Sequence, residues 1–225
     1  MPSTPRHLPL RPEGLPLIGA TAWLALVFAV LGWAVPALVL LLAMLFCLQF
    51  FRDPDRIVPE DPNVAVAPAD GRVVRVDRAV DPMDGVEKDR VAIFMHVFNV
   101  HVNRAPVCAT VAARRHTPGR FTAASRDKAS LDNERNALWL TDERNESWTV
   151  VQIAGWVARR ILCWAETGEN LQRGQRLGMI QFGSRVDLYL PQSYVIVVSR
   201  QQKTVAGQTV VSRHSEEQGG EPGRT

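Results

Sequence analysis

The distribution of apolar and polar residues divides the chain into two unlike parts. From Leu15 to Phe51 there is no charged residue, and leucine, alanine, valine, phenylalanine and tryptophan dominate. One membrane-spanning helix needs about 20 apolar residues, so this stretch is too long for one span and slightly short for two. Pro36 lacks a backbone N–H and favours a break. We therefore expect a helical hairpin, roughly 16–34 and 37–51, with a single tilted membrane helix as the alternative.

Basic residues flank this membrane segment (15–51) on both sides, with Arg6 and Arg11 before it and Arg52 and Arg56 after it. Cytoplasmic flanks of membrane proteins carry an excess of lysine and arginine. Both ends are therefore expected on the cytoplasmic side, as a hairpin requires. No small-residue cleavage site follows the apolar run, which disfavours a cleaved signal peptide. The proline-rich residues 1–14 are expected to form a flexible lead.

Beyond Phe51 the pattern changes to short β-type runs separated by turn residues such as Pro68-Ala69-Asp70-Gly71. Helical periodicity is thin, which predicts a β-rich domain over residues 52–211. The tail 212–225 is rich in serine, glutamate, glutamine and glycine and is predicted to be disordered. The expected strands are 64–67, 72–76, 90–94, 99–103, 148–153, 161–165, 177–180, 186–190 and 195–199.

The composition argues against several classes of protein. A chain of 225 residues suits one catalytic domain with accessories. The net charge of +3 is mild and no block of lysine and arginine occurs, which argues against nucleic-acid binding. Cys47, Cys108 and Cys163 are far apart and form no CxxC pair, so neither a zinc site nor a redox dithiol is predicted. A reducing, cytoplasmic setting is the economical interpretation for the main domain.

The dipeptide Gly183-Ser184 lies between two strand-like runs. Taken alone, it is most simply a turn. It is also a candidate self-processing site, because the Ser184 hydroxyl can attack the carbonyl of Gly183 and form an ester. Glycine tolerates the strained backbone that such an attack needs. Elimination of the ester would leave dehydroalanine, which hydrolyses to a pyruvoyl group on Ser184.

Two further residues supply groups that this activation needs. Asp70 lies in a turn preceded by proline, and His101 lies in a strand-like run. A self-attacking serine needs a base to take its proton and a carboxylate to orient that base. Each residue alone has an ordinary explanation, since a turn aspartate is usually a cap and a strand histidine is usually structural.

Several long motifs in a fixed order carry a resemblance to a known family. From residue 50 to about residue 211, the chain resembles the short, type A form of the phosphatidylserine decarboxylase family. The motifs are FFRDP at 50–54, PADG at 68–71, FNVHVNRAP at 98–106, PGRF at 118–121, DKAS at 127–130, NERN at 133–136, AGWVARRI at 154–161 and RGQRLGMIQFGSRVDLYLP at 173–191.

The resemblance implies that Gly183 and Ser184 are the cleavage pair. Residues 1–183 would become a β chain and residues 184–225 an α chain that carries the pyruvoyl group, and the two would remain together as a heterodimer. Asp70 matches the processing aspartate of the family.

The identity of the processing base stays open, because this sequence departs from the long form of the family. His101 matches the first histidine of the long form's Tyr-His-x-x-His segment, and Arg104 stands where that segment has its second. A complete triad therefore cannot be carried over. His101 is the preferred base, with His96 or another group as the alternative.

The resemblance also implies the reaction. The pyruvoyl ketone would form a Schiff base with the amine of phosphatidylserine, and loss of carbon dioxide would give phosphatidylethanolamine. The cofactor is then the covalent pyruvoyl group, with no metal and no PLP. Partners would be the lipid substrate and the bilayer, with a homo-oligomer left open, and the site would lie on the cytoplasmic side of the cell membrane.

A phosphodiester substrate also calls for cations. Guanidinium groups offer forked donors to phosphate or carboxylate. For any single arginine a structural role is the commoner outcome. The candidates within the family-like motifs are Arg104, Arg159, Arg160 and Arg185.

Rival functions come from the turns at 168–180, which resemble those of lipoyl and biotinyl carrier domains and suggest a barrel-sandwich core. A membrane-tethered carrier-like binding module would need a modifiable lysine beside methionine, and Lys88, Lys128 and Lys203 lack that setting. A serine hydrolase would need a G-x-S-x-G elbow, which the sequence lacks.

Overall fold

The computed structural model describes residues 9–119, 133–155, 160–181 and 184–215. The chain divides into two compact units, Met1–Asp55 and Arg56–Thr225. The predicted candidates Gly183 and Arg159 lie outside the described residues. The same is true of the DKAS motif at 127–130.

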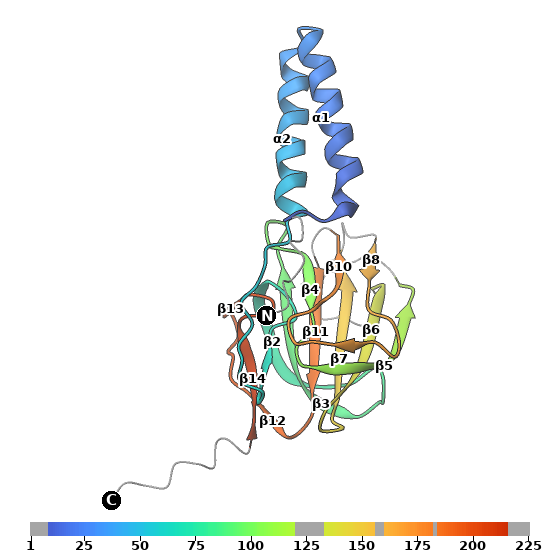
Figure 1. The fold of residues 1–225 in the computed structure, drawn as a ribbon, viewed down its shortest axis with the longest axis vertical. Helices are drawn as coiled ribbons and strands as arrows, with labels where there is room; N and C mark the ends of the chain where they lie inside the picture. Colours follow the sequence, from blue (N-terminus) through green and yellow to red (C-terminus); the bar gives the residue numbers. More distant parts are fainter. Residues whose placement is uncertain (1–8, 120–132, 156–159, 182–183, 216–225) are drawn as a thin grey trace, which may run out of the picture. The chain divides into compact units, whose positions relative to one another are not determined.

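The first unit is a helical hairpin (Figure 1). A 3-10 turn, η1 (Pro12–Gly14), leads into α1 (Leu15–Val30), and α2 (Ala34–Phe50) follows after a short turn. The break falls at Gly32, whose φ of +74° suits glycine. The sequence-based position of the break, at Pro36, was wrong: Pro36 lies in the first turn of α2, where a missing N–H costs nothing.

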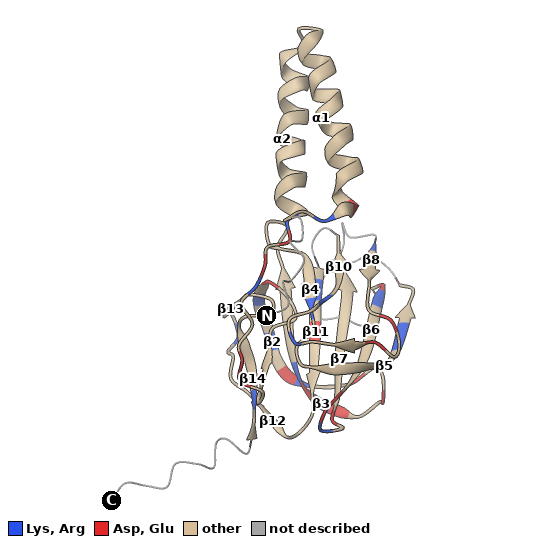
Figure 2. Cartoon of the chain, viewed as in Figure 1, with Lys and Arg blue, Asp and Glu red and all other residues tan. Residues whose placement is uncertain are grey.

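Both helices expose apolar side chains and carry no charge along their length (Figure 2). Trp23 is 66% exposed and Val30 is 79% exposed. The stretch Pro12–Val30 is long and apolar enough to cross a membrane, with 19 residues and a mean hydropathy of 1.7, whereas α2 is shorter. An exposed apolar surface of this kind is typical of a segment that interacts with a membrane or with another protein.

The second unit is built almost entirely from antiparallel strands, which confirms the predicted mainly β fold. Its largest sheet has eight strands in the order β13-β2-β3-β11-β7-β6-β5-β9 and curls as a half-barrel (Figure 1). Two three-stranded sheets, β1-β14-β12 and β4-β10-β8, accompany it. The strands are β1 (Val64–Val66), β2 (Gly71–Val80), β3 (Glu87–Met95), β4 (Val102–Arg104), β5 (Ala109–Thr117), β6 (Arg135–Asp142), β7 (Ser147–Ala154), β8 (Ile161–Cys163), β9 (Asn170–Leu171), β10 (Arg176–Ile180), β11 (Ser184–Leu190), β12 (Tyr194–Ile196), β13 (Lys203–Thr204) and β14 (Val210–His214).

Strand β11 holds the middle of the large sheet, paired with β3 on one side and β7 on the other. Its alternate residues Val186, Leu188 and Leu190 point into the main core. The residues between them, Arg185, Asp187 and Tyr189, face the other side of the sheet and are buried as well. Because both faces of β11 are covered, its register is strongly determined.

The C-terminal boundary needs a correction. The tail was predicted to be disordered from Ser212 onwards, but Ser212 and His214 belong to β14 and are buried. This strand pairs with β1 and β12, so polar residues that look like a solvated tail lie between two partners. The boundary at Ser212 was therefore too early, and residues 216–225 lie outside the described part.

Candidate active site

The candidate nucleophile opens the central strand. Ser184 is the first residue of β11 and lies opposite Met95 of β3 and Ala154 of β7. Its side chain is fully buried, and no described residue forms a hydrogen bond with its Oγ. Buried hydroxyl groups are usually hydrogen-bonded. Among the described residues, Ser184 and Ser212 are the two buried serines whose hydroxyl has no hydrogen-bond partner.

His101 is joined to the end of β10 through its backbone. The carbonyl of His101 accepts a hydrogen bond from the N–H of Ile180 at 3.4 Å, four residues before Ser184 in the chain. Its ring is fully buried, and Nδ1 lies 3.0 Å from the carbonyl oxygen of Asn99. A carbonyl can only accept, so Nδ1 carries a proton in this contact, and in a neutral ring Nε2 would be the nitrogen that accepts a proton.

His96 has a different environment. It follows the last residue of β3, its side chain is exposed, and its ring stacks on Phe98 with centroids 5.3 Å apart. A turn closed by the Asn99 N–H and the His96 carbonyl, 2.8 Å apart, separates it from His101. The structure therefore buries one of the two candidate bases and exposes the other.

Asp70 lies in the turn that enters β2 and is held by two groups. One carboxylate oxygen accepts from Arg56 Nη2 at 2.8 Å, and the other accepts from the backbone N–H of Ala206 at 2.7 Å. The neighbouring Ala69 carbonyl accepts from Thr204 Oγ1 at 3.0 Å. The turn is therefore fastened to a segment far along the chain, within the predicted α chain.

The candidate substrate arginines fall into two groups. Arg104 is buried and its Nη1 donates to the Gly174 carbonyl at 2.9 Å, while Arg185 is buried and bound to Asp187. Arg160 is exposed, and its carbonyl accepts from Gln181 N–H at 3.2 Å, which places it at the end of β10. Arg160 is thus the described candidate that solvent and substrate can reach most easily.

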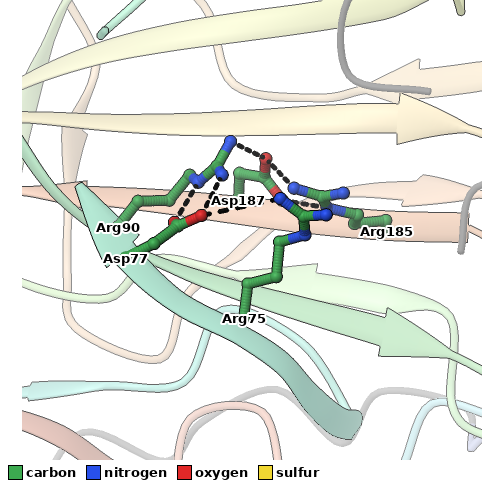
Figure 3. Close-up of polar contacts among 5 residues, drawn as sticks. All are labelled: Arg75, Asp77, Arg90, Arg185 and Asp187. Atoms are coloured by element: carbon green, nitrogen blue, oxygen red, sulfur yellow. Dashed lines mark hydrogen bonds and ion pairs between the residues drawn. The ribbon is translucent and has the colours of Figure 1, made fainter. Parts of the chain in front are cut away.

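The sequence analysis missed a cluster of arginines and aspartates, which Figure 3 shows. Its members Arg185 and Asp187 alternate with Ser184 along β11 and so lie on the opposite face of the sheet. Arg90 donates to both oxygens of Asp77, at 2.9 and 2.7 Å, and its Nη1 lies 3.4 Å from Asp187. Burial opposes the charge of Arg90, but Asp77 and Asp187 outweigh it and raise the pKa of its guanidinium. The signal was available in the sequence, since Asp187 is a charged residue within a predicted buried strand.

A second missed set consists of buried amides. Asn103 and Gln152 are fully buried and Asn136 is 1% exposed, and they are joined by side-chain hydrogen bonds. Gln152 interrupts an otherwise apolar run, and such a residue is a sign of an internal polar network. Within the described ranges, no three histidine, cysteine, aspartate or glutamate side chains gather in a way that could hold a metal ion.

Comparison with known proteins gives a consistent result. The family model described as phosphatidylserine decarboxylase matches residues 43–212. The chain is 51% identical over 204 residues to the phosphatidylserine decarboxylase proenzyme of Solidesulfovibrio magneticus, covering 91% of this chain and 95% of the relative. It is 50% identical over 208 residues to that of Nitratidesulfovibrio vulgaris, covering 92% and 96%. It is also 50% identical over 201 residues to that of Nitrosomonas europaea, covering 89% and 93%.

Proposed function

The chain belongs to the phosphatidylserine decarboxylase family, and from that premise we propose that it cuts itself between Gly183 and Ser184 and then decarboxylates phosphatidylserine to phosphatidylethanolamine. The observation that carries the self-cleavage is the buried Ser184 hydroxyl at the start of β11, which no described residue engages.

Self-cleavage follows from the chemistry of that hydroxyl. Ser184 Oγ attacks the carbonyl carbon of Gly183, the C–N bond breaks, and an ester replaces the amide. Loss of the Ser184 α-proton expels the carboxylate of Gly183 and leaves dehydroalanine, which takes up water and releases ammonia to give the pyruvoyl group. That group supplies a ketone for the substrate amine and an acceptor for the electrons released with carbon dioxide.

His101 is the residue that we assign to proton transfer. The carbonyl of Asn99 fixes its tautomer and leaves Nε2 basic. Its burial keeps the ring in one place, which a positioned base requires. Asp70 lies at the same end of the sheet, because β2 begins beside the end of β3 that pairs with Ser184, and it would act there as an ion pair with Arg56.

The topology supports a two-chain product that stays assembled. The α chain would contribute β11, β12, β13 and β14, and each of these is paired with strands of the β chain or with one another. Because β11 lies between β3 and β7, cutting the peptide before Ser184 would not release it.

The first unit and an exposed cation support a membrane-bound enzyme that acts on a phospholipid. The apolar hairpin supports anchoring in the cell membrane, and the basic residues Arg11 and Arg52 at its base support a cytoplasmic catalytic unit. Arg160 is the preferred cation for the phosphate or carboxylate of the lipid headgroup. Arg104, Arg159 and Arg185 remain weaker candidates for that role.

The intact mass of the purified protein, measured under denaturing conditions, tests the proposal. We expect two fragments that separate between Gly183 and Ser184, with the smaller blocked to N-terminal sequencing and reactive towards hydrazine reagents. Ser184→Ala should remain a single uncut chain without decarboxylase activity, while Ser184→Cys should cleave slowly, because a thiol can make the same acyl shift. Normal fragments from Ser184→Ala would exclude Ser184 as the processing residue.

A further inference from the structure

A line of side-chain amides crosses the core and ends beside Ser184. Arg114 Nε donates to Asn136 Oδ1 at 3.0 Å, and Asn136 Nδ2 donates to Gln152 Oε1 at 3.1 Å. Gln152 Nε2 then donates to Asn103 Oδ1 at 2.9 Å. Finally, Asn103 Nδ2 lies 3.6 Å from the sulfur of Met95. We call Asn136, Gln152 and Asn103 the amide chain.

The register of the sheet places this chain on the Ser184 side of β11. Gln152 is the cross-strand partner of Val186, two residues along from the pair formed by Ala154 and Ser184, so the side chains of Gln152 and Ser184 share one face. Met95, at the other end, is the cross-strand partner of Ser184 on β3. Opposed side chains on a sheet lie about 5 Å apart at their Cβ atoms, so the last amide contacts a direct neighbour of Ser184.

The exposed Arg114, at one end of the amide chain, sets the orientation of all three amides. A guanidinium has donors and no acceptor, so the atom of Asn136 that faces Arg114 must be its oxygen. Asn136 then presents its NH2 group to Gln152, Gln152 presents its own NH2 group to Asn103, and Asn103 presents its NH2 group towards Met95. All three amide dipoles therefore point their positive ends along the chain towards Met95, the cross-strand partner of Ser184.

The packing of the sheet does not by itself account for these residues. All four contacts join side chains, so none of them satisfies a backbone group of the sheet. Burying an amide is costly, and apolar residues would fill the same space more cheaply. The final acceptor is a thioether, which is a weak one, so the Asn103 NH2 group keeps most of its capacity to donate.

We propose that the amide chain positions the NH2 group of Asn103 as a fixed positive dipole for the reaction at Ser184, with Arg114 setting its direction. This inference rests on the proposed self-cleavage. Attack by Ser184 Oγ places negative charge on the carbonyl oxygen of Gly183. A pre-oriented donor near that charge lowers the barrier, and an oxygen in its place raises it. Asn103, Gln152 and Asn136 are then positioning residues.

A substitution of the exposed Arg114 that reverses the orientation of the three amides tests this proposal. In Arg114→Glu the side chain can only accept, so Asn136 turns over, Gln152 and Asn103 follow, and Asn103 presents oxygen instead of NH2 towards Met95. Arg114 is exposed, so the fold has little reason to change. The matched control is Arg115→Glu, the same charge change at the next residue, whose Nη1 donates to the Pro82 carbonyl at 2.7 Å.

The readout is the rate at which freshly synthesised full-length chain converts to two fragments, together with the thermal unfolding temperature. We expect Arg114→Glu to cleave at least about tenfold more slowly than wild type, by analogy with loss of a donor at an oxyanion site. Arg115→Glu should cleave at the wild-type rate, both variants should unfold near the wild-type temperature, and Arg114→Lys should recover much of the rate because it donates.

A second variant, Asn136→Asp, also reverses the amides of Gln152 and Asn103. Asn136→Asp keeps a partner for Arg114 but offers only oxygen to Gln152, which forces Gln152 and Asn103 to turn over. It should cleave as slowly as Arg114→Glu. If Arg114→Glu does not fold, Asn136→Asp alone tests whether the orientation of the amides affects cleavage. Wild-type rates in Asn136→Asp, or equal slowing in Arg114→Glu and Arg115→Glu, would overturn the inference. Absence of cleavage in the wild type would instead overturn the proposed function.

Discussion

Arg185 and Asp187 are joined by two parallel hydrogen bonds, Nε to Oδ1 at 2.6 Å and Nη2 to Oδ2 at 2.8 Å, on the face of β11 turned away from Ser184. Each side chain is 1% exposed. Arg90 of β3 approaches the same carboxylate at 3.4 Å. The strand that begins with the candidate nucleophile is therefore held to its neighbour by a buried charge cluster.

Removing the carboxylate should destabilise the fold. Asp187→Ala leaves Arg185 buried without its partner and removes one partner of Arg90, so we expect the free energy of unfolding to fall by about 3–5 kcal/mol. Urea unfolding of the chain that lacks residues 1–55 measures it. Asp77→Ala is the control, because the Asp77 side chain is 35% exposed and should cost about 1 kcal/mol or less. Equal losses in the two variants would contradict the special role of Asp187.

Asp70→Asn separates charge from geometry at the turn entering β2. The asparagine oxygen can still accept from the Ala206 N–H, so the turn and the unfolding temperature should be nearly preserved. Loss of the negative charge should slow self-cleavage by about tenfold or more if Asp70 supports the base electrostatically. Cleavage is followed by gel over time. A wild-type rate would leave Asp70 with only the structural task of holding Arg56 and Ala206.

Most of the strands with strong apolar patterns were predicted from the sequence, although the apolar strand β6 was missed, and so were several strands without such a pattern. β3, β7 and β11 are buried on both faces and read as apolar runs. In β5, by contrast, only Ala109 and Val111 are buried, and the rest is threonine, alanine, arginine and histidine with partly or fully exposed side chains. No local signal distinguishes such a strand from a loop, because pairing with β6 is what fixes it.

The site was predictable only in part, for a related reason. Ser184 and His101 could be named from motifs, but their surroundings come from pairings across long stretches of chain. The partner of the Asp70 carboxylate at Ala206 is 136 residues away. Ser184 meets Met95 only because β11 pairs with β3. The periodicity of apolar residues contains no information on such contacts. The resemblance to the family identified the candidate residues but not the residues that surround them.

The membrane segment should supply location and no chemistry. Deleting residues 1–55 removes the hairpin and keeps Arg56 with its bond to Asp70. We expect the truncated chain to leave the membrane fraction for the soluble one and to cleave itself at a rate close to that of the full chain. Fractionation after a salt wash, with a gel of each fraction, measures both. Truncated protein that stays in washed membranes would show that the catalytic unit has a strong lipid-binding surface of its own.

The two histidines offer a direct test of the base. His101 is buried with its tautomer fixed by Asn99, and His96 is exposed and stacked on Phe98. A general base contributes about 100-fold or more, so His101→Ala should slow self-cleavage by at least that factor. Whatever pyruvoyl enzyme forms should also decarboxylate poorly. His96→Ala, five residues earlier in the same segment, is the matched control and should cleave normally.

The burial of His101 makes a folding control necessary, because removing a buried ring leaves a cavity. His101→Gln fills much of that space without a comparable base, so it should fold like the wild type by circular dichroism and still cleave slowly. A folded His101→Gln that cleaves at the wild-type rate would exclude His101 as the base. If His96→Ala were then uncut in a folded protein, the exposed ring would have to reach Ser184 from the turn after β3, and the base would be His96.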